Sequence, residues 1–341
     1  MALGLSVGTA WAGAKNGTLD IYWADVEGGA GTLLVTPAGE SILIDSGNAG
    51  VRDPNRLAKL AKEQAGLSKI DFLVTTHMHN DHFGGAAELS EMIPIGTVLD
   101  NGVTDENPDG NKADRTWVHT IKPYREMKVG NRRRIEAGDV LPLKQKDGAP
   151  HLELRCLGAR QKFAGPTLAS PVKIDCATAV KQDTDTSDNA NSVVLVLTFG
   201  SFRFFAGGDL TWNIEEKLVC PENLVGRVDV YQANHHGLDV SNNPLLVHTL
   251  SPTVAVFSNG TSKGCGAKSY QTIKANPSVK AIYQIHKNLR ADSENNTSNE
   301  RIANLDQKCE GGWIELAVQP DSKSYTVSIP SNKHSQTFFT R

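Results

Sequence analysis

The chain has 341 residues, of which 35 are Lys or Arg and 38 are Asp or Glu, so its formal net charge is −3. Hydrophobic residues make up 39% and charged residues 21%, a globular composition that argues against long disorder. The charge excludes a strongly basic protein that coats nucleic acid, and because no apolar run reaches the roughly 18 residues that span a bilayer, we expect no membrane span.

The first seventeen residues are small and largely apolar. Ala10-Trp11-Ala12 resembles a small-x-small cleavage site, although the usual preceding basic residues are missing. Residues 1–17 are therefore interpreted as a signal-peptide remnant or as a flexible N-terminus, and residues 18–341 as a single domain. A signal peptide would place the protein in the periplasm or outside the cell, with a mature N-terminus near Gly13; otherwise the protein is cytoplasmic.

The first hundred residues alternate short β-branched runs with helical patterns. The expected elements are strands at 19–26, 32–36 and 41–45, a helix at 53–65, a strand at 71–75 and a helix at 84–92. The second half repeats this order, with strands at 191–199 and 202–206, a helix at 212–219, strands at 228–232 and 253–258, and a closing hairpin of 313–318 with 325–329. The alternation predicts an α/β fold.

Two long polar stretches, residues 101–148 and 158–191, interrupt the pattern. Loops longer than about 15 residues are uncommon unless they form lids or binding loops. We therefore expect both stretches to be loop insertions around the mouth of the site.

Five cysteines are widely spaced and form no C-x-x-C pair, which excludes a zinc ribbon and a thioredoxin-type site. In an exported protein, disulfides Cys156–Cys176 and Cys265–Cys309 are the preferred pairs, because they would join polar segments. Five unpaired thiols are the alternative.

The motif His77-Met78-His79-Asn80-Asp81-His82 follows a predicted buried strand. Imidazole and carboxylate suit Zn²⁺, Mn²⁺ or Fe²⁺. Three histidines and one aspartate within six residues are too crowded for one tetrahedral ion, but they can be divided between two adjacent ions.

Two further clusters also follow predicted strands. Asp209, in Gly207-Gly208-Asp209, can bridge two cations with one carboxylate, and His235-His236 can supply another imidazole. Each cluster alone is weak evidence for a metal site. Together they favour a binuclear metal site, because open α/β sheets gather their functional groups at strand ends.

Over about residues 19–260 the order of these motifs resembles the metallo-β-lactamase-fold hydrolase superfamily. The motifs are Asp45 in L-I-D-S-G, the H-x-H-x-D-H loop, G-G-D at Asp209 and H-H-G at His235. The ComEC-like branch is most similar, because Asp25-Val26-Glu27-Gly28-Gly29 resembles its D-V-x-x-G and Ser241 lies downstream of H-H-G. The resemblance implies a four-layer αββα sandwich with metals at one edge, between the two β-sheets.

The resemblance also implies the roles of individual residues. His77 and His79 correspond to ligands of the first metal, Asp81, His82 and His235 to ligands of the second, and Asp209 to the bridge. Asp45 corresponds to the position that orients a ligand by hydrogen bonding. His235 is preferred over His236 as the ligand because it comes nearer to the strand. Asp81 and His236 are the candidate catalytic residues, His236 as the group that protonates the leaving group; a buried structural histidine is the alternative.

One departure from the superfamily pattern concerns the first metal. A histidine expected shortly before the strand that leads to G-G-D is missing from residues 183–192. Asn191 or Asn189 is then expected to approach the first metal or a bound water, and the first ion should bind more weakly than the second.

The implied activity is hydrolysis assisted by two divalent ions, with Zn²⁺ expected and Mn²⁺ or Fe²⁺ as alternatives. A phosphodiester is the preferred substrate, as for a phosphodiesterase or nuclease-like enzyme. A small molecule or nucleic acid both fit, although the sequence has no strongly basic signature. An amide or lactone hydrolase, including a β-lactamase, and a non-catalytic metal-binding protein are the alternatives.

Overall fold

The computed structural model describes residues 13–166, 173–177, 179–291 and 294–341. Most of the predicted signal-peptide remnant, residues 1–12, lies outside these ranges. Within them, we find no helix with the length and apolar character needed to cross a membrane.

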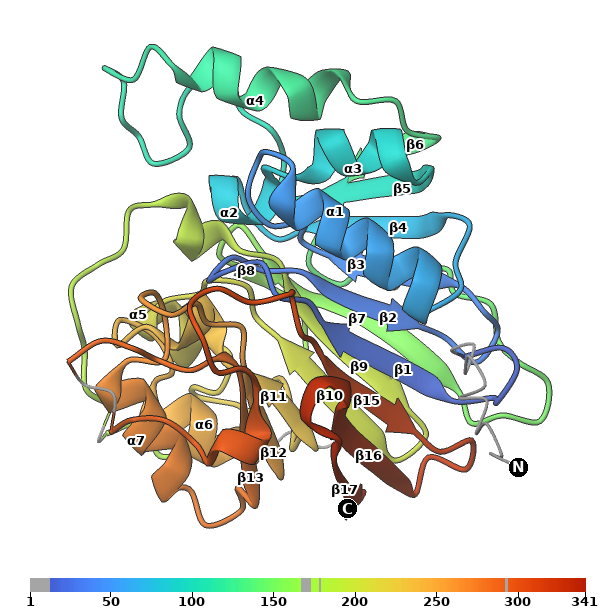
Figure 1. The fold of residues 1–341 in the computed structure, drawn as a ribbon. Helices are drawn as coiled ribbons and strands as arrows, with labels where there is room; N and C mark the ends of the chain where they lie inside the picture. Colours follow the sequence, from blue (N-terminus) through green and yellow to red (C-terminus); the bar gives the residue numbers. More distant parts are fainter. Residues whose placement is uncertain (1–12, 167–172, 178, 292–293) are drawn as a thin grey trace, which may run out of the picture.

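The described chain forms four layers, with two β-sheets packed face to face and helices on both outer surfaces (Figure 1). One sheet has nine strands in the order β17-β16-β15-β1-β2-β3-β4-β5-β6. Their bounds are β1 Leu19–Trp23, β2 Thr32–Val35, β3 Ser41–Ile44, β4 Ile70–Thr75, β5 Ile95–Asp100, β6 Asn131–Arg134, β15 Ile314–Val318, β16 Ser324–Ile329 and β17 His334–Phe339.

The other sheet has eight strands among the described residues, in the order β14-β13-β12-β11-β10-β9-β7-β8. Their bounds are β7 Leu152–Ala159, β8 Lys162–Phe163, β9 Val194–Phe199, β10 Phe202–Ala206, β11 Val230–Gln232, β12 Val254–Phe257, β13 Ala281–His286 and β14 Ile302–Asn304. The predicted four-layer αββα architecture is confirmed.

Helices of the N-terminal half cover the first sheet and helices of the C-terminal half cover the second (Figure 1). The α-helices are α1 Arg52–Lys59, α2 Asn80–Phe83, α3 Ala86–Met92, α4 Trp117–Glu126, α5 Trp212–Glu216, α6 Pro244–Leu250 and α7 Ala267–Ala275. Short helical turns are η1 Leu60–Gln64, η2 Asp188–Asn191, η3 Asn234–Gly237, η4 Asn299–Arg301 and η5 Pro330–Asn332.

Three apolar cores hold these layers together. The central core lies between the sheets, where Trp23 meets Phe204 edge to face with ring centroids 5.8 Å apart. Each outer core combines apolar residues of one sheet and of its own helices: Leu43 and Leu57 belong to one, and Phe205 and Leu246 to the other. Because interiors are close-packed, the central core fixes the position of one sheet relative to the other.

Parallel strand pairs place the functional segments at one edge. The run β3-β4-β5-β6 is parallel in the first sheet, and the run from β10 to β14 is parallel in the second. The carboxyl ends of neighbouring parallel strands meet at the same side of a sheet. The segments after β3, β4, β10 and β11 are therefore brought together.

The first polar stretch is not only a loop. It contains α4 and β6, and Trp117, Ile121 and Tyr124 of α4 are buried against the first sheet. These positions follow the helical i, i+4, i+7 spacing, but the intervening polar residues and Pro123 hide the pattern in the sequence.

The predicted disulfides are wrong. The structure instead joins Cys176 to Cys220, whose Cα atoms lie 6.1 Å apart, and leaves the other three cysteines of the chain as free thiols. Cys156 lies in the central core, Cys265 lies in the outer core of the second sheet, and Cys309 lies beside Asp25. Pairing requires Cα atoms within about 7 Å, which sequence spacing does not report.

We expect thiol titration of the denatured, unreduced protein to find three free thiols per chain, and five after reduction, because only Cys176 and Cys220 are bonded among its five cysteines. Ellman's reagent measures both numbers on protein purified without reductant. Five reactive thiols before reduction would contradict the Cys176–Cys220 bond.

Candidate metal centre

The segment after β4 is anchored to Asp45, which follows β3 with a positive φ of 61°. Asp45 accepts hydrogen bonds from the backbone N–H and the hydroxyl of Thr76, at 2.7 and 2.8 Å. The same carboxylate lies 2.8 Å from Nδ1 of His82. Asp45 thus lies behind His82 and directs Nε2 of that ring toward the centre, while its role in metal binding stays a prediction.

Four side chains converge at the edge between the sheets. One ligand atom each from Asp81, His82, Asp209 and His236 lies within 4.8 Å of the other three. Oδ2 of Asp209 is 3.2 Å from Nε2 of His82 and 3.3 Å from Nε2 of His236. Oδ2 of Asp81 is 3.4 and 3.2 Å from the same two nitrogen atoms. Two imidazoles and two carboxylates form a donor set that suits a divalent transition metal.

His77 and His79 form a second pair of donors beside this group. Nε2 of His77 lies 3.0 Å from Nδ1 of His79 and 3.9 Å from Oδ2 of Asp209. The other ring nitrogen of His79 is held by Asp109 at 2.9 Å. Carboxylates in this position orient metal-binding imidazoles. The two histidines are therefore arranged around a point next to Asp209, on the side where the first ion is expected.

The two histidines after β11 take different positions. His236 is buried, and its Nδ1 lies 3.1 Å from the carbonyl of Ser258, so its Nε2 faces Asp81 and Asp209. His235 is more exposed, and its Nε2 lies 3.5 Å from Oδ2 of Asp209. The geometry therefore favours His236, rather than the predicted His235, as the partner of Asp81 and His82. Because both ring nitrogens of His236 are engaged, it is poorly placed to protonate a leaving group.

The two asparagines proposed to replace the missing histidine lie in η2, and their amides differ in surroundings. Asn191 donates to Asp188 at 3.0 Å and accepts from Gln161 at 3.5 Å. Oδ1 of Asn189 is buried without a hydrogen-bond partner among the described residues. The side-chain amide of Asn191 therefore already makes hydrogen bonds on both of its polar atoms. Asn189 is the asparagine whose Oδ1 is available to accept one.

The charges of the centre are strongly coupled. Burial by itself raises the pKa of Asp209, but the surrounding imidazoles, His236 foremost, outweigh it and hold that pKa well below its usual value. Burial lowers the pKa of His82, yet Asp209 and Asp81 raise it well above its usual value. Burial and the adjacent His82 hold the pKa of His77 well below its usual value, which keeps that ring neutral. The imidazoles thus balance the negative charge of the buried carboxylates. A bound metal ion would supply part of the same positive charge.

Two neighbours of the centre were missed in the sequence. Asp109 lies in the first polar stretch, 30 residues from His79, and Lys263 follows β12 with its ammonium on Oδ2 of Asp81. Nothing in their local sequence marks either residue. An open cavity of about 660 Å³ lies next to the centre and is lined by His235 and Asn189 together with Asp183, Asp185, Trp212, Asp239 and Lys268.

Comparison with known proteins agrees with this architecture. Residues 26–142 match the model of the metallo-beta-lactamase superfamily. No curated protein matches the sequence.

Three solved structures show distant similarity. CmlA, a diiron beta-hydroxylase from Streptomyces venezuelae, shares 14% identity with a TM-score of 0.42, over 77% of this chain and 52% of CmlA. The CmlA beta-hydroxylase E377D mutant shares 15%, with a TM-score of 0.46, over 79% and 52%. MEM-A1, a subclass B3 metallo-beta-lactamase from a soil metagenome library, shares 14%, with a TM-score of 0.34, over 78% and 75%. The chain thus spans about half the length of CmlA.

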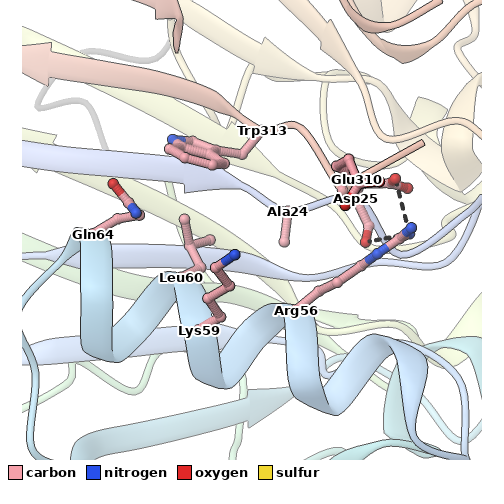
Figure 2. A pocket seen from close by; sticks show the side chains of 9 residues that line it. Ala24, Asp25, Arg56, Lys59, Leu60, Gln64, Glu310 and Trp313 are labelled. Carbon is pink, nitrogen blue, oxygen red and sulfur yellow. Dashed lines mark hydrogen bonds and ion pairs between the residues drawn. The ribbon is translucent and has the colours of Figure 1, made fainter. Parts of the chain in front are cut away.

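A second group of ligand-type side chains, Asp25, Glu27, His286 and Cys309, lies outside the centre. The buried carboxylate of Asp25 accepts from His286 at 2.7 Å, from Arg56 at 2.9 Å and from the Cys309 thiol at 3.0 Å. Figure 2 shows Arg56 reaching from α1 to Asp25. Because the guanidinium already supplies the balancing cation, this group is a structural anchor for the loop after β1.

The Asp25→Asn variant should lose about 3–5 kcal/mol of folding free energy at pH 7, because it leaves the Arg56 charge without its buried partner. Burial raises the pKa of Asp25, but His286, Cys309 and Arg56 outweigh it and the net pKa is lowered. Its contribution is therefore complete above the unfolded pKa of about 3.9 and is lost as the pH falls through the folded value. Urea unfolding from pH 3 to 7 measures both effects.

The matched control is Glu126→Gln, which removes an exposed ion pair with Lys122 worth about 0–1 kcal/mol. An Asp25→Asn protein as stable as this control at pH 7 would contradict the anchoring role.

Proposed function

We propose that this chain is a metal-dependent hydrolase that acts on phosphodiesters, with two divalent ions held by His77, His79, Asp81, His82, Asp209 and His236. The donor set supports two ions, because imidazole nitrogens of His77, His82 and His236 all lie within 3.9 Å of one buried carboxylate oxygen, Oδ2 of Asp209. Zn²⁺ suits these donors, with Mn²⁺ or Fe²⁺ as alternatives. When bound, such ions lower the pKa of a water toward about 7 and polarise the oxygen under attack.

The residues around the donors keep them in position. Asp45 fixes the ring of His82, Asp109 fixes His79, and the Ser258 carbonyl fixes His236. Rings held in this way present one nitrogen atom without reorganising. The protein therefore supplies a rigid frame for the reaction rather than a mobile acid.

We propose an anionic substrate because of the contact between Lys263 and Asp81. Its ammonium lies on Oδ2 of Asp81, and the side chain is 39% exposed, so it is accessible from outside. A charge at this place attracts a phosphoryl oxygen and stabilises negative charge that develops on it. We place the protein closest to the ComEC-like branch, supported by Asp25-Val26-Glu27-Gly28-Gly29 and by His235-His236-Gly237.

We further propose a periplasmic or secreted location. The Cys176–Cys220 disulfide supports it, because disulfides persist in oxidising compartments.

The Asp209→Asn variant should lose activity at least about a hundredfold, because the shared carboxylate charge balances both donor groups. Hydrolysis of bis(p-nitrophenyl) phosphate by zinc-loaded protein measures this, and a chelator should abolish the same activity. Asp147→Asn, at an exposed loop carboxylate, is the control and should retain full turnover. Equal turnover of both variants would remove Asp209 from the site.

The same assay separates substrate classes when it includes a phosphomonoester, a lactone and a chromogenic β-lactam. The proposal expects the phosphodiester to be turned over fastest. Faster hydrolysis of the lactone or the β-lactam would replace it with the amide or lactone alternative.

The Lys263→Ala variant should raise KM or lower kcat/KM for the phosphodiester by about 10–100-fold, the worth of one charged hydrogen bond of about 1.5–3 kcal/mol. Lys263→Arg keeps the charge and should retain most activity. An uncharged ester, if it is hydrolysed at all, should respond little to either variant. An equal loss with both substrates would show that Lys263 acts only on the folded geometry of Asp81.

A further inference from the structure

The donors assigned to the first ion are one imidazole short. His77, His79 and the shared Asp209 face it, whereas the second ion has Asp81, His82 and His236 in addition to Asp209. Residues 183–192 contain no histidine. The turn η2 lies within them and offers two asparagine amides and the carboxylate of Asp188, whose two oxygens already accept hydrogen bonds from Met78 and Asn191. Zinc sites prefer imidazole, thiolate or carboxylate donors. A further donor on this side would complete the set.

His235 also directs a ring nitrogen at the shared carboxylate of Asp209. Nε2 of His235 lies 3.5 Å from Oδ2 of Asp209, close to the 3.3 Å of His236. The two rings are tilted by 63° with centroids 6.2 Å apart. In the described structure, Asp81 and His82 form their four-membered group with His236 and without His235. His235 therefore presents a nitrogen to Asp209 from outside that group.

The backbone at His235 adopts a conformation that is unfavourable in free energy. His235 and His236 have φ values of 54° and 55°, a left-handed conformation that disfavours side chains by about 1–2 kcal/mol per residue. Buried Glu215 holds the loop by accepting hydrogen bonds from Asn234 at 2.7 Å and Asn242 at 2.8 Å. The backbone N–H of His235 also donates to the carbonyl of Gly208, directly before Asp209.

The second nitrogen of the ring has the kind of partner that metal-binding histidines have. Nδ1 of His235 lies 3.3 Å from the hydroxyl of Ser241, which leaves Nε2 directed at Asp209. Such an outer hydrogen bond fixes the tautomer and the ring orientation.

We propose that His235 is the protein ligand that completes the first metal site, in place of the histidine that residues 183–192 lack. The inference rests on the two-ion centre of the proposed function. The competing donor is Oδ1 of Asn189, which is buried without a hydrogen-bond partner among the described residues and lines the same cavity. A neutral amide oxygen is a poorer donor for zinc than imidazole.

The test is metal stoichiometry of the full chain, measured without substrate. Wild type, His235→Gly and Asn189→Ala are dialysed against buffered Zn²⁺ and analysed for metal per chain, and Co²⁺-loaded samples report ligand changes in their visible spectra. Glycine is chosen because it removes the imidazole and tolerates the positive φ of this position. His235→Asn, which also tolerates a left-handed backbone, repeats the test if the glycine variant is unstable.

Wild type and Asn189→Ala should each bind two equivalents, whereas His235→Gly should keep one. The first ion should weaken by more than the roughly 10–100-fold that loss of an outer hydrogen-bond partner costs. Ser241→Ala removes such a partner of His235 and gives that smaller loss as an internal standard. Free imidazole in the millimolar range should restore the second equivalent to His235→Gly, which a merely structural defect would not allow.

Two equivalents bound by His235→Gly with wild-type affinity, or loss of the first ion in Asn189→Ala instead, would overturn the proposal. Failure of imidazole to restore the lost ion would also overturn it. Because no substrate is involved, a chain that hydrolyses no phosphodiester but shows the expected stoichiometry loses the proposed function alone. A wild-type chain that binds one ion loses the two-ion centre and this inference together.

Discussion

The buried carboxylate of Asp209 is the constraint on which the rest of the centre depends. An unpaired charge at this depth would cost several kcal/mol, so it must be balanced by neighbours. Nitrogen atoms of His82, His235 and His236 lie within 3.5 Å of one of its oxygens. Burial lowers the pKa of His82 and of His236, but Asp209 and Asp81 outweigh burial and raise both values, so these two rings balance the carboxylates. The negative and positive charges of the centre thus balance one another. A divalent ion can bind there if it displaces protons from the imidazoles.

That balance requires the two sheets to be held in fixed relative positions. The H-x-H-x-D-H loop follows β4 in the first sheet, whereas Asp209 and the histidine pair follow β10 and β11 in the second. The central core between the sheets sets their separation, and the Trp23 indole adds a hydrogen bond across it to Gln232 at 2.8 Å. A shift of one sheet by an ångström would separate the donors, so packing far from the site determines its geometry.

The loop after β1 forms a second link between scaffold and centre. Its second residue, Asp25, is fixed by Arg56 of α1 and by His286 at the end of β13. Further along, Ala30 donates to the carbonyl of Asp81, and a Cβ on Gly29 would lie 2.6 Å from the same oxygen. Glycine is therefore required where this loop passes the backbone of a candidate ligand. The anchor and the close approach together keep Asp81 in place.

The sequence by itself determined the α/β class, most of the strands and the segments that carry the candidate ligands. These features are local: alternating apolar residues, glycines at strand ends and donors within six residues of one another define them without distant contacts. Tertiary structure alone decided that His236 rather than His235 joins Asp81, that Asp109 and Lys263 border the centre, and that Cys176 pairs with Cys220. Each of these depends on distances between segments far apart in the chain or on a left-handed backbone at non-glycine residues. Short-range sequence patterns report neither, because they record which elements form and not how close packing brings them together.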